Sequence, residues 1–286
     1  MICSLRITVQ EKQGRSYLKD VFVTPPFRVV PVGQHKSDQS SYLMVMSTSP
    51  GILSGDEYQI DIQVKENARL QLQSQSYQRL YNMEKSATQH MKVRLEKGSS
   101  FFYVPHPVVP HENSCFTSVN QVYLHDHCEL MMSEIITCGR KHHGEVFKYR
   151  HFQNLIEIYH HQKLILKDNV LLQPALMPLN STGLLEGYTH QGTLIYISTS
   201  KEPGNESNES VHDKAPSFRE KEKSVQELIE YLFLMMETET DIIFGISAVQ
   251  QNGFVLRILG NGGEQLYNSF QKVQQVIWAQ TYQATI

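Results

Sequence analysis

The chain has 286 residues, 40% of them apolar and 19% charged, which is enough apolar material for a substantial core and too much for a disordered chain. Lys and Arg number 26 against 29 Asp and Glu, a formal net charge of −3, and the basic residues form no long cluster. This pattern argues against a nucleic-acid-binding protein, and the longest apolar stretch, Leu228 to Met236, is too short to span a membrane. We therefore expect a globular protein of one large or two small domains, with neither nucleic acid nor membrane as a partner.

The first ten residues alternate as in a β-strand and lack the basic and apolar regions of a signal peptide, so a cytoplasmic protein is expected. The four cysteines form no CxxC pair and fit no zinc-site spacing. Reduced, mostly buried thiols are therefore expected. Cys128 and Cys138 flank one predicted strand, which leaves a joint metal role open.

Residues 1–200 consist largely of segments in which apolar and polar residues alternate, the pattern of strands with one buried face. Turn residues separate these segments, as at Lys97-Gly98 and Lys167-Asp168-Asn169. The expected strands are Leu5–Val9, Tyr58–Val64, Leu70–Gln73, Met91–Leu95, Phe101–Val104, Val122–Leu124, Leu130–Thr137, Val146–Tyr149, Leu155–Tyr159 and Leu164–Leu166.

A faint repeat combines a turn residue, a small residue and the start of a strand. The three copies begin at Asn67, Gly98 and His127. Their small residues, taken as Ala68, Ser100 and Cys128, follow one another at intervals of 32 and 28 residues. Such spacing predicts a mainly β fold of stacked, sandwich-like or solenoid-like sheets, although a plain meander gives a similar pattern.

The composition changes after residue 200. Residues 201–223 are charged and nearly free of aromatic side chains, which predicts a flexible loop. Residues 224–286 are predicted to form helix, strand, strand and helix, with Ser224 as the N-cap of the first of two C-terminal α-helices. Together with the β-rich core, residues 1–200, they are expected to form a single domain, 1–286.

The common catalytic motifs are missing from the sequence. It has no phosphate-binding loop, no dinucleotide-binding glycine motif, no nucleophile elbow and no HExxH zinc motif. This absence favours a binding or scaffold role over an enzyme.

A loop with two glycines, residues 49–56, ends in a carboxylate just before a predicted strand. Gly51 and Gly55 suit tight turns with positive φ. Asp56 either caps this turn or faces a polar cavity.

A polar and aromatic run, residues 75–81, contains Arg79 and Tyr81 and fits either the rim of a strand or the wall of a wetted channel or partner surface. A proline-rich segment, residues 104–113, holds three metal-competent side chains, His106, His111 and Glu112. Its three prolines predict an edge or a loop. The two imidazoles are either metal ligands, for which Ni²⁺ or Zn²⁺ is suited, or surface residues.

A basic loop framed by two glycines lies within residues 133–145. Arg140 and Glu145 are expected to form an ion pair that stabilises this loop, with Gly144 between them; the alternative is an exposed basic loop that contacts a partner. Glu134 lies on the strand before the loop.

Ordered landmarks along the chain resemble those of urease accessory proteins of the UreD type, also called UreH. Each landmark is short, but together, in the same order, they extend over nearly the whole length of the chain. They are Thr24-Pro25-Pro26-Phe27, Gly51 to Asp56, Asn67-Ala68, Ser74 to Tyr81, Pro107 to Pro110, Glu134, Cys138-Gly139-Arg140, Gly144 to Phe147, Asp168-Asn169, Gly187 to His190 and Gly253 to Gly260.

The resemblance implies a β-rich, partly solenoid-like domain with two helices and no catalysis of its own. It implies a scaffold that bridges the urease apoprotein to a UreF-type accessory protein and a UreG-type GTPase, and leaves open a dimer within that complex. It also implies transient Ni²⁺ in a water-filled passage, with no tightly bound cofactor. His106 and His111 are not the usual residues of the family, and residues 201–223 look like a local elaboration.

A passage must admit an ion yet release it, so scattered carboxylates and amides suit it better than a closed Cys/His cage. The candidate carboxylates for the passage are Asp56, Glu134, Glu145 and Glu157. Glu157 lies between Ile156 and Ile158 and therefore also fits a solvent-facing position. The candidate structural or interaction residues are Gly51, Gly55, Arg79, Tyr81, Arg140 and Gly144.

Two alternatives remain open from the sequence. One is a stand-alone metal-binding protein, which would hold nickel tightly whereas a passage would hold it weakly. The other is an exported β-solenoid enzyme that acts on polysaccharide, which the missing signal peptide disfavours.

Overall fold

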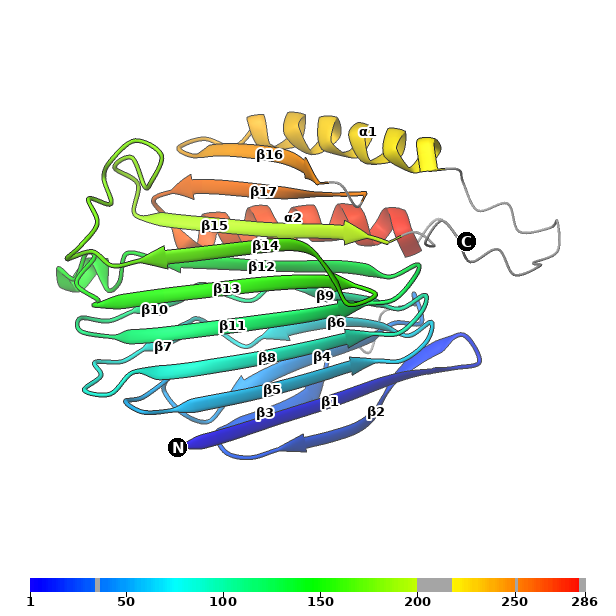
Figure 1. Cartoon of the computed structure of the whole chain (residues 1–286), viewed down its shortest axis with the longest axis horizontal. Helices are drawn as coiled ribbons and strands as arrows, with labels where there is room; N and C mark the ends of the chain where they lie inside the picture. Colours follow the sequence, from blue (N-terminus) through cyan, green and yellow to red (C-terminus); the bar gives the residue numbers. More distant parts are fainter. Residues whose placement is uncertain (34–36, 200–217, 250–251, 283–286) are drawn as a thin grey trace.

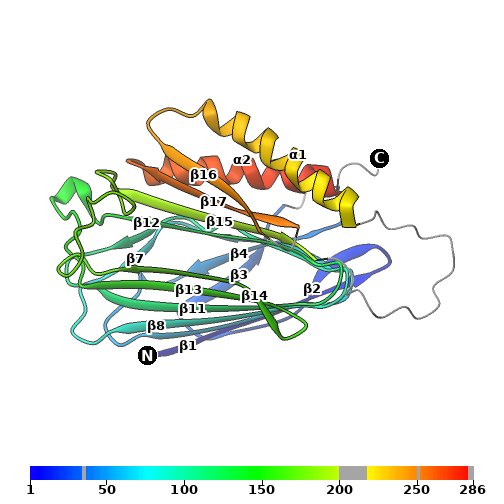
Figure 2. The same cartoon turned by 45° about the horizontal axis from the view of Figure 1, so that its top comes forward.

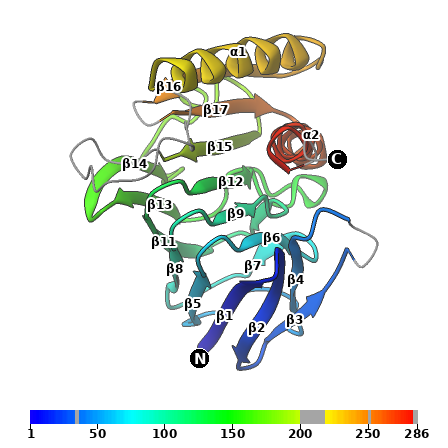
Figure 3. The same cartoon turned by 90° about the vertical axis from the view of Figure 1, so that its right-hand side faces the viewer.

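The computed structural model describes residues 1–33, 37–199, 218–249 and 252–282. It is mainly β, with two layers of strands and two long helices beside one of the layers (Figures 1 and 3). The predicted fold class, mainly β with two helices, is confirmed.

The first layer is a sheet of seven strands in the order β14-β13-β11-β8-β5-β1-β2. Its five inner strands run parallel, and an antiparallel strand closes each edge. The strands are β1 Ile2–Lys12, β2 Arg15–Val23, β5 Glu57–Val64, β8 Ala87–Leu95, β11 Cys115–Leu124, β13 His151–His160 and β14 Lys163–Leu172.

The second layer is a sheet of ten strands whose main path is β16-β17-β15-β12-β9-β6-β4-β3. From β4 to β13 the chain alternates between the layers, apart from the short strands β7 and β10. The strands are β3 Phe27–Pro31, β4 Ser41–Ser47, β6 Arg69–Ser74, β7 Gln78–Leu80, β9 Ser100–Tyr103, β10 Val108–Pro110, β12 Glu129–Thr137, β15 His190–Ser198, β16 Ile243–Val249 and β17 Gly253–Gly260.

The three predicted repeats are turns that stack on one another as the chain enters β6, β9 and β12. Each begins with a residue at positive φ, between 57° and 70°, namely Asn67, Gly98 and His127. The next residue in each turn, Ala68, Ser99 or Cys128, is completely buried. Residues 69, 100 and 129 then pair in register. The second small residue is therefore Ser99, and its assignment to Ser100 was wrong by one position.

Three further local predictions are wrong. Residues 146–149 form no strand; they follow a short 3₁₀ helix, Lys141–His143, and Phe147 adopts a φ of 54°. The turn predicted at Lys167-Asp168-Asn169 lies inside β14. The hairpin turn is instead at His161 and Gln162, both at positive φ. The prolines at 107 and 110 do not exclude pairing either, because β10 pairs with β7 on one side and β12 on the other.

The helices α1 Phe218–Glu237 and α2 Gly263–Tyr282 lie against the ten-stranded sheet (Figure 2). Helix α1 begins before Ser224, so this residue is inside the helix and is not its N-cap. The rest of the predicted loop, residues 201–217, lies outside the described residues. Among the described residues, neither helix combines the length and the apolar character needed to cross a bilayer.

Three apolar clusters hold these layers together. One fills the space between the sheets near the stacked turns, for example at Leu70 and Ile158. A second joins the ten-stranded sheet to the helices through Phe270 and Leu232. The third lies near the opposite ends of the strands and includes Phe152. Burial of this apolar surface is the main force that keeps the sheets stacked.

Candidate functional site

A cavity of about 180 Å³ lies between the two sheets. Inward side chains of β8, β11 and β13 line one wall, and side chains of β6, β9 and β12 line the other. The exposed residues Gln75, Ser76 and Arg79 also line it, so the cavity reaches the surface beside β7.

Polar side chains form a row across the seven-stranded wall of the cavity. Gln89, Ser118 and Asn154 occupy in-register positions on β8, β11 and β13 and therefore point to the same face. The Gln89 amide donates to Ser118 Oγ at 3.3 Å, and Asn120 Nδ2 donates to Asn154 Oδ1 at 2.6 Å. The buried amides of Asn120 and Asn154 bond to each other, and the half-buried Gln89 bonds to a hydroxyl, so this row is polar without carrying charge.

Glu134 faces this row from β12, on the opposite wall. Loss of water around the carboxyl raises its pKa to about 8, and the charge of Asp168 contributes in the same direction. A hydrogen bond with Asn154 only partly opposes this effect. Of the described residues that line the cavity, Glu134 is the only carboxylate.

A polar path continues from Glu134 toward the other edge of the sheets. Glu134 pairs in register with Thr193 on β15, which pairs with Arg257 on β17. Among the described residues, none hydrogen-bonds the buried Thr193 Oγ1. Arg257 forms an ion pair with the buried Asp168 on β14, and 57% of the Arg257 side chain is exposed. Polar groups thus extend from the cavity to a second surface position.

The mouth of the cavity is built from the 49–56 loop and β7. Gly51 does not adopt positive φ, contrary to the prediction; a Cβ on it would lie 2.4 Å from the Arg79 carbonyl oxygen. The Ile52 amide donates to that same oxygen at 2.8 Å, and Tyr81 N–H donates to the Ile52 carbonyl at 3.0 Å. Gly51 and Arg79 line the cavity, and Tyr81 lies directly beside them.

The structure gives His106 and His111 different partners. His106 lines the cavity mouth, stacks on Tyr267 with ring centroids 4.2 Å apart, and its Nδ1 lies 2.9 Å from Ser74 Oγ. His111 is buried and packs on Tyr81, with centroids 4.8 Å apart. Burial lowers the pKa of both imidazoles. They are not part of any metal-competent cluster among the described residues.

Asp56 lies outside the cavity, in the turn before β5. Its Oδ2 accepts the Leu53 N–H at 3.0 Å, and its own N–H donates to the Leu53 carbonyl at 3.1 Å. Gly55 has the positive φ, 73°, that was predicted for it. The carboxylate therefore closes a tight turn.

Asp56→Ala is expected to lower the free energy of unfolding by about 1–2 kcal/mol, because the Leu53 N–H loses a charged acceptor. Urea denaturation measures this effect, and Glu84→Ala, which removes an exposed carboxylate, is the control. An Asp56→Ala protein as stable as the parent would show that this hydrogen bond contributes nothing to the turn.

Arg140 and Glu145 form the predicted ion pair. The Arg140 hydrogen bond lowers the pKa of Glu145 to about 2 despite the burial of the carboxyl. Gly144 ends the short 3₁₀ helix at a φ of 74°. Neither Arg140 nor Glu145 lines the cavity, so the pair organises the loop after β12.

Glu157 lies on the outer face of the seven-stranded sheet, away from the cavity. Its carboxylate accepts hydrogen bonds from Lys167 at 3.1 Å, Gln121 at 3.2 Å and Tyr159 at 3.0 Å. Of the four candidate carboxylates, only Glu134 lines the cavity.

Several cavity residues were missed from the sequence, although a signal was present. Ser118 and Asn120 occupy the same strand phase as Phe116 and Val122, and Asn154 occupies that of Ile156. Polar residues in the buried phase of a strand need partners. Their recurrence on neighbouring strands is therefore the signal for a polar interior.

Comparison with known proteins identifies the family of this chain. The model of the family described as UreD urease accessory protein matches residues 3–285. A urease accessory protein UreD of Flavobacterium johnsoniae is 49% identical over 97% of this chain and 93% of its own length. The protein of the same name from Actinobacillus pleuropneumoniae is 30% identical over 98% of this chain and 97% of its own length. That of Acetivibrio thermocellus is 30% identical over 96% of this chain and 96% of its own length. The chain belongs to the UreD family of urease accessory proteins.

Proposed function

We propose that this protein is a non-catalytic scaffold of urease maturation in the cytoplasm, which bridges the urease apoprotein to a UreF-type accessory protein and a UreG-type GTPase. In this proposal Ni²⁺ crosses the protein through the polar cavity at Glu134. The observation that carries the proposal is one carboxylate that lines a cavity between two sheets and is set among amides and hydroxyls.

The protonation of Glu134 suits a transient cation. With a pKa of about 8, the carboxyl is mostly neutral at pH 7, so it places no uncompensated negative charge in the cavity. An arriving cation favours the carboxylate and displaces the proton. The departing ion allows the proton to return, so the site binds the ion only weakly at neutral pH.

The donor set also favours release. Oxygen atoms of Glu134, Asn154 and Ser118 are weaker nickel ligands than thiolates or several imidazoles. Among the described residues that line the cavity, His106 is the only imidazole, and no cysteine is present. A site of this kind does not trap the ion.

An apolar surface on α1 supports the scaffold part of the proposal. Tyr231, Phe233 and Leu234 are 51%, 42% and 64% exposed on a helix that packs against β16 and β17. Exposed apolar groups at neighbouring positions are characteristic of surfaces that bind another protein.

The test is nickel loading of urease in cells that make this protein as wild type, as Glu134→Gln or as Glu157→Gln. Glu157 is the matched control because its carboxylate is hydrogen-bonded on the outer face. We expect Glu134→Gln to retain the partners in a pull-down while the nickel content of purified urease falls at least about tenfold. Glu157→Gln is expected to match the wild type.

Two results would overturn the proposal in different ways. Full nickel content with Glu134→Gln would exclude the cavity as the route. A wild-type protein that captures neither urease apoprotein nor the two accessory proteins would exclude the bridging role.

A further inference from the structure

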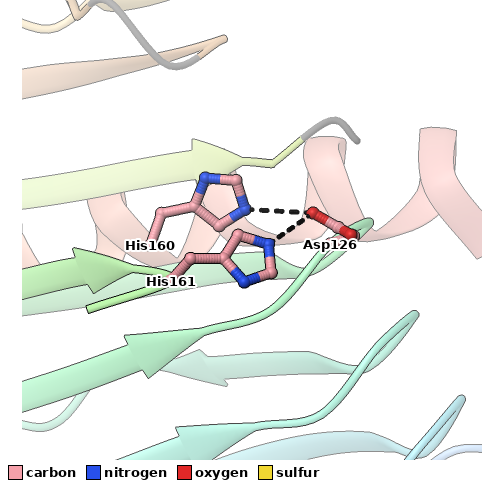
Figure 4. A group of neighbouring side chains, drawn as sticks. All are labelled: Asp126, His160 and His161. Carbon is pink, nitrogen blue, oxygen red and sulfur yellow. Dashed lines mark hydrogen bonds and ion pairs between the residues drawn. The ribbon is translucent and has the colours of Figure 1, made fainter. Parts of the chain in front are cut away.

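A second group of metal-competent side chains lies at the turns that follow β11 and β13. Asp126 belongs to the turn between β11 and β12, while His160 ends β13 and His161 begins the hairpin to β14. Figure 4 shows both imidazoles directed at the Asp126 carboxylate. Among the described residues, this is the only group of three or more such side chains close enough to share an ion.

The spacing of the ligand atoms is close to what an ion requires. Asp126 Oδ1 lies 3.3 Å from His160 Nε2 and 2.7 Å from His161 Nε2. One ligand atom from each of the three residues lies within 4.8 Å of the other two. Bonds of about 2.1 Å to one metal ion place neighbouring ligand atoms roughly 3.0–3.4 Å apart, depending on the coordination geometry. The two distances from Asp126 Oδ1 are close to this range, and rotation of the side chains would close any wider separation, which is at most 4.8 Å.

The backbone holds these side chains in place. Leu124 on β11 pairs in register with His160 on β13, which brings the two turns side by side. His160 is only 7% exposed, whereas His161 reaches the surface. His161 and Gln162 adopt φ values of 45° and 67°, a region that residues other than glycine seldom occupy. This turn directs the second imidazole back toward Asp126.

An ion can reach the group from solvent. The Asp126 side chain is 23% exposed and that of His161 is 31% exposed. His125 adds a third imidazole nearby, with its ring centroid 5.7 Å from that of His161.

We propose that Asp126, His160 and His161 form a binding site for one divalent transition-metal ion that prefers imidazole, such as Ni²⁺ or Zn²⁺. Two imidazoles and one carboxylate leave coordination positions for water or a further ligand. The site is distinct from the cavity, since none of its residues lines the cavity and buried apolar side chains such as Val122 and Ile158 lie along the strands between them.

The experiment is a titration of the metal-free full chain, without a polyhistidine tag, with Ni²⁺ and separately with Co²⁺. His161→Asn is the first variant, because asparagine accepts the positive φ of this turn. Asp126→Asn is the second, and it preserves the size of the side chain. The control is His142→Asn with His143→Asn, which removes two exposed histidines from the loop after β12.

We expect wild type and control to bind one Ni²⁺ per chain at this site. Each test variant should bind it at least about tenfold more weakly, because loss even of a group that only orients a ligand costs 10–100-fold. Co²⁺ should give visible absorption bands with the wild type that are absent from both test variants. Glu134→Gln should retain the site, which separates this inference from the proposed passage.

Equal Ni²⁺ binding by wild type and both test variants would overturn the inference, as would loss of the ion only from the His142/His143 control. Circular dichroism of each variant checks that it is folded. If one test variant is unfolded, the other still decides the outcome.

Discussion

Glu134→Gln is expected to stabilise the protein, and the gain is expected to grow as the pH rises from 5 to 8. The pKa of Glu134 is about 8 in the folded protein, whereas an ordinary glutamate titrates near 4.5. Between these values the unfolded chain releases the proton and the folded protein keeps it, so the free energy of unfolding falls as the pH rises. Glutamine has no proton to lose, so the variant avoids this loss of stability. Each unit of pKa difference between the folded and unfolded states corresponds to about 1.4 kcal/mol, so at pH 8 the free energy of unfolding of the variant is expected to exceed that of the parent by on the order of a few kcal/mol.

Thermal unfolding of the variant and the parent at pH 5, 6, 7 and 8 measures this gain. Glu157→Gln is the control, because hydrogen bonds from Lys167, Gln121 and Tyr159 lower the pKa of Glu157, opposite to the shift at Glu134. A difference between Glu134→Gln and the parent that stays constant with pH would show that the carboxyl is ionised throughout. Greater stability together with loss of nickel loading would identify Glu134 as a residue kept for its function rather than for the fold.

Gly51→Ala is expected to lower the free energy of unfolding by about 2 kcal/mol or more. The new Cβ would lie 2.4 Å from the Arg79 carbonyl oxygen, and this oxygen already accepts the Ile52 N–H. Because the obstacle is backbone, the loop must move away from β7, at a cost similar to that of overpacking a core. The displacement would also disturb the mouth of the cavity, since Gly51 and Arg79 both line it.

Urea denaturation of Gly51→Ala measures this cost, with Gly245→Ala on β16 as the control. A Cβ at Gly245 meets nothing within 4 Å, so its substitution should have little effect. Equal stability of the two variants would mean that the loop moves freely and does not form a fixed mouth.

Many strands could be predicted because one face packs against the other layer, whereas β2, β3, β4 and β15 were not predicted. Alternation located β1, β5, β8, β13 and the end of β11, and the small buried residues located the stacked turns. The prediction failed where tertiary contacts decide. The residues at 167–169 resemble a turn, but Asp168 is held inside β14 by Arg257, which is distant in sequence.

The candidate site was predictable only in part for a related reason. Strand alternation tells which residues share a face, but not which polar group has a cavity in front of it. Glu157 is flanked by two buried isoleucines and therefore lies on the outer face, which the sequence left open. Glu134 lies on a strand with almost no exposed residue on either face, and only the packing of the opposite wall gives it a polar surrounding.

The antiparallel strands that close the seven-stranded sheet also limit how far it can grow. A stack of parallel strands presents the same hydrogen-bonding edge at every step, so nothing in its repeat prevents further chains from joining end to end into fibres. Here β2 and β14 reverse direction at the two edges, and each carries exposed lysines, Lys19 on β2 and Lys163 and Lys167 on β14. Charge at both edges therefore opposes the addition of further strands to this sheet.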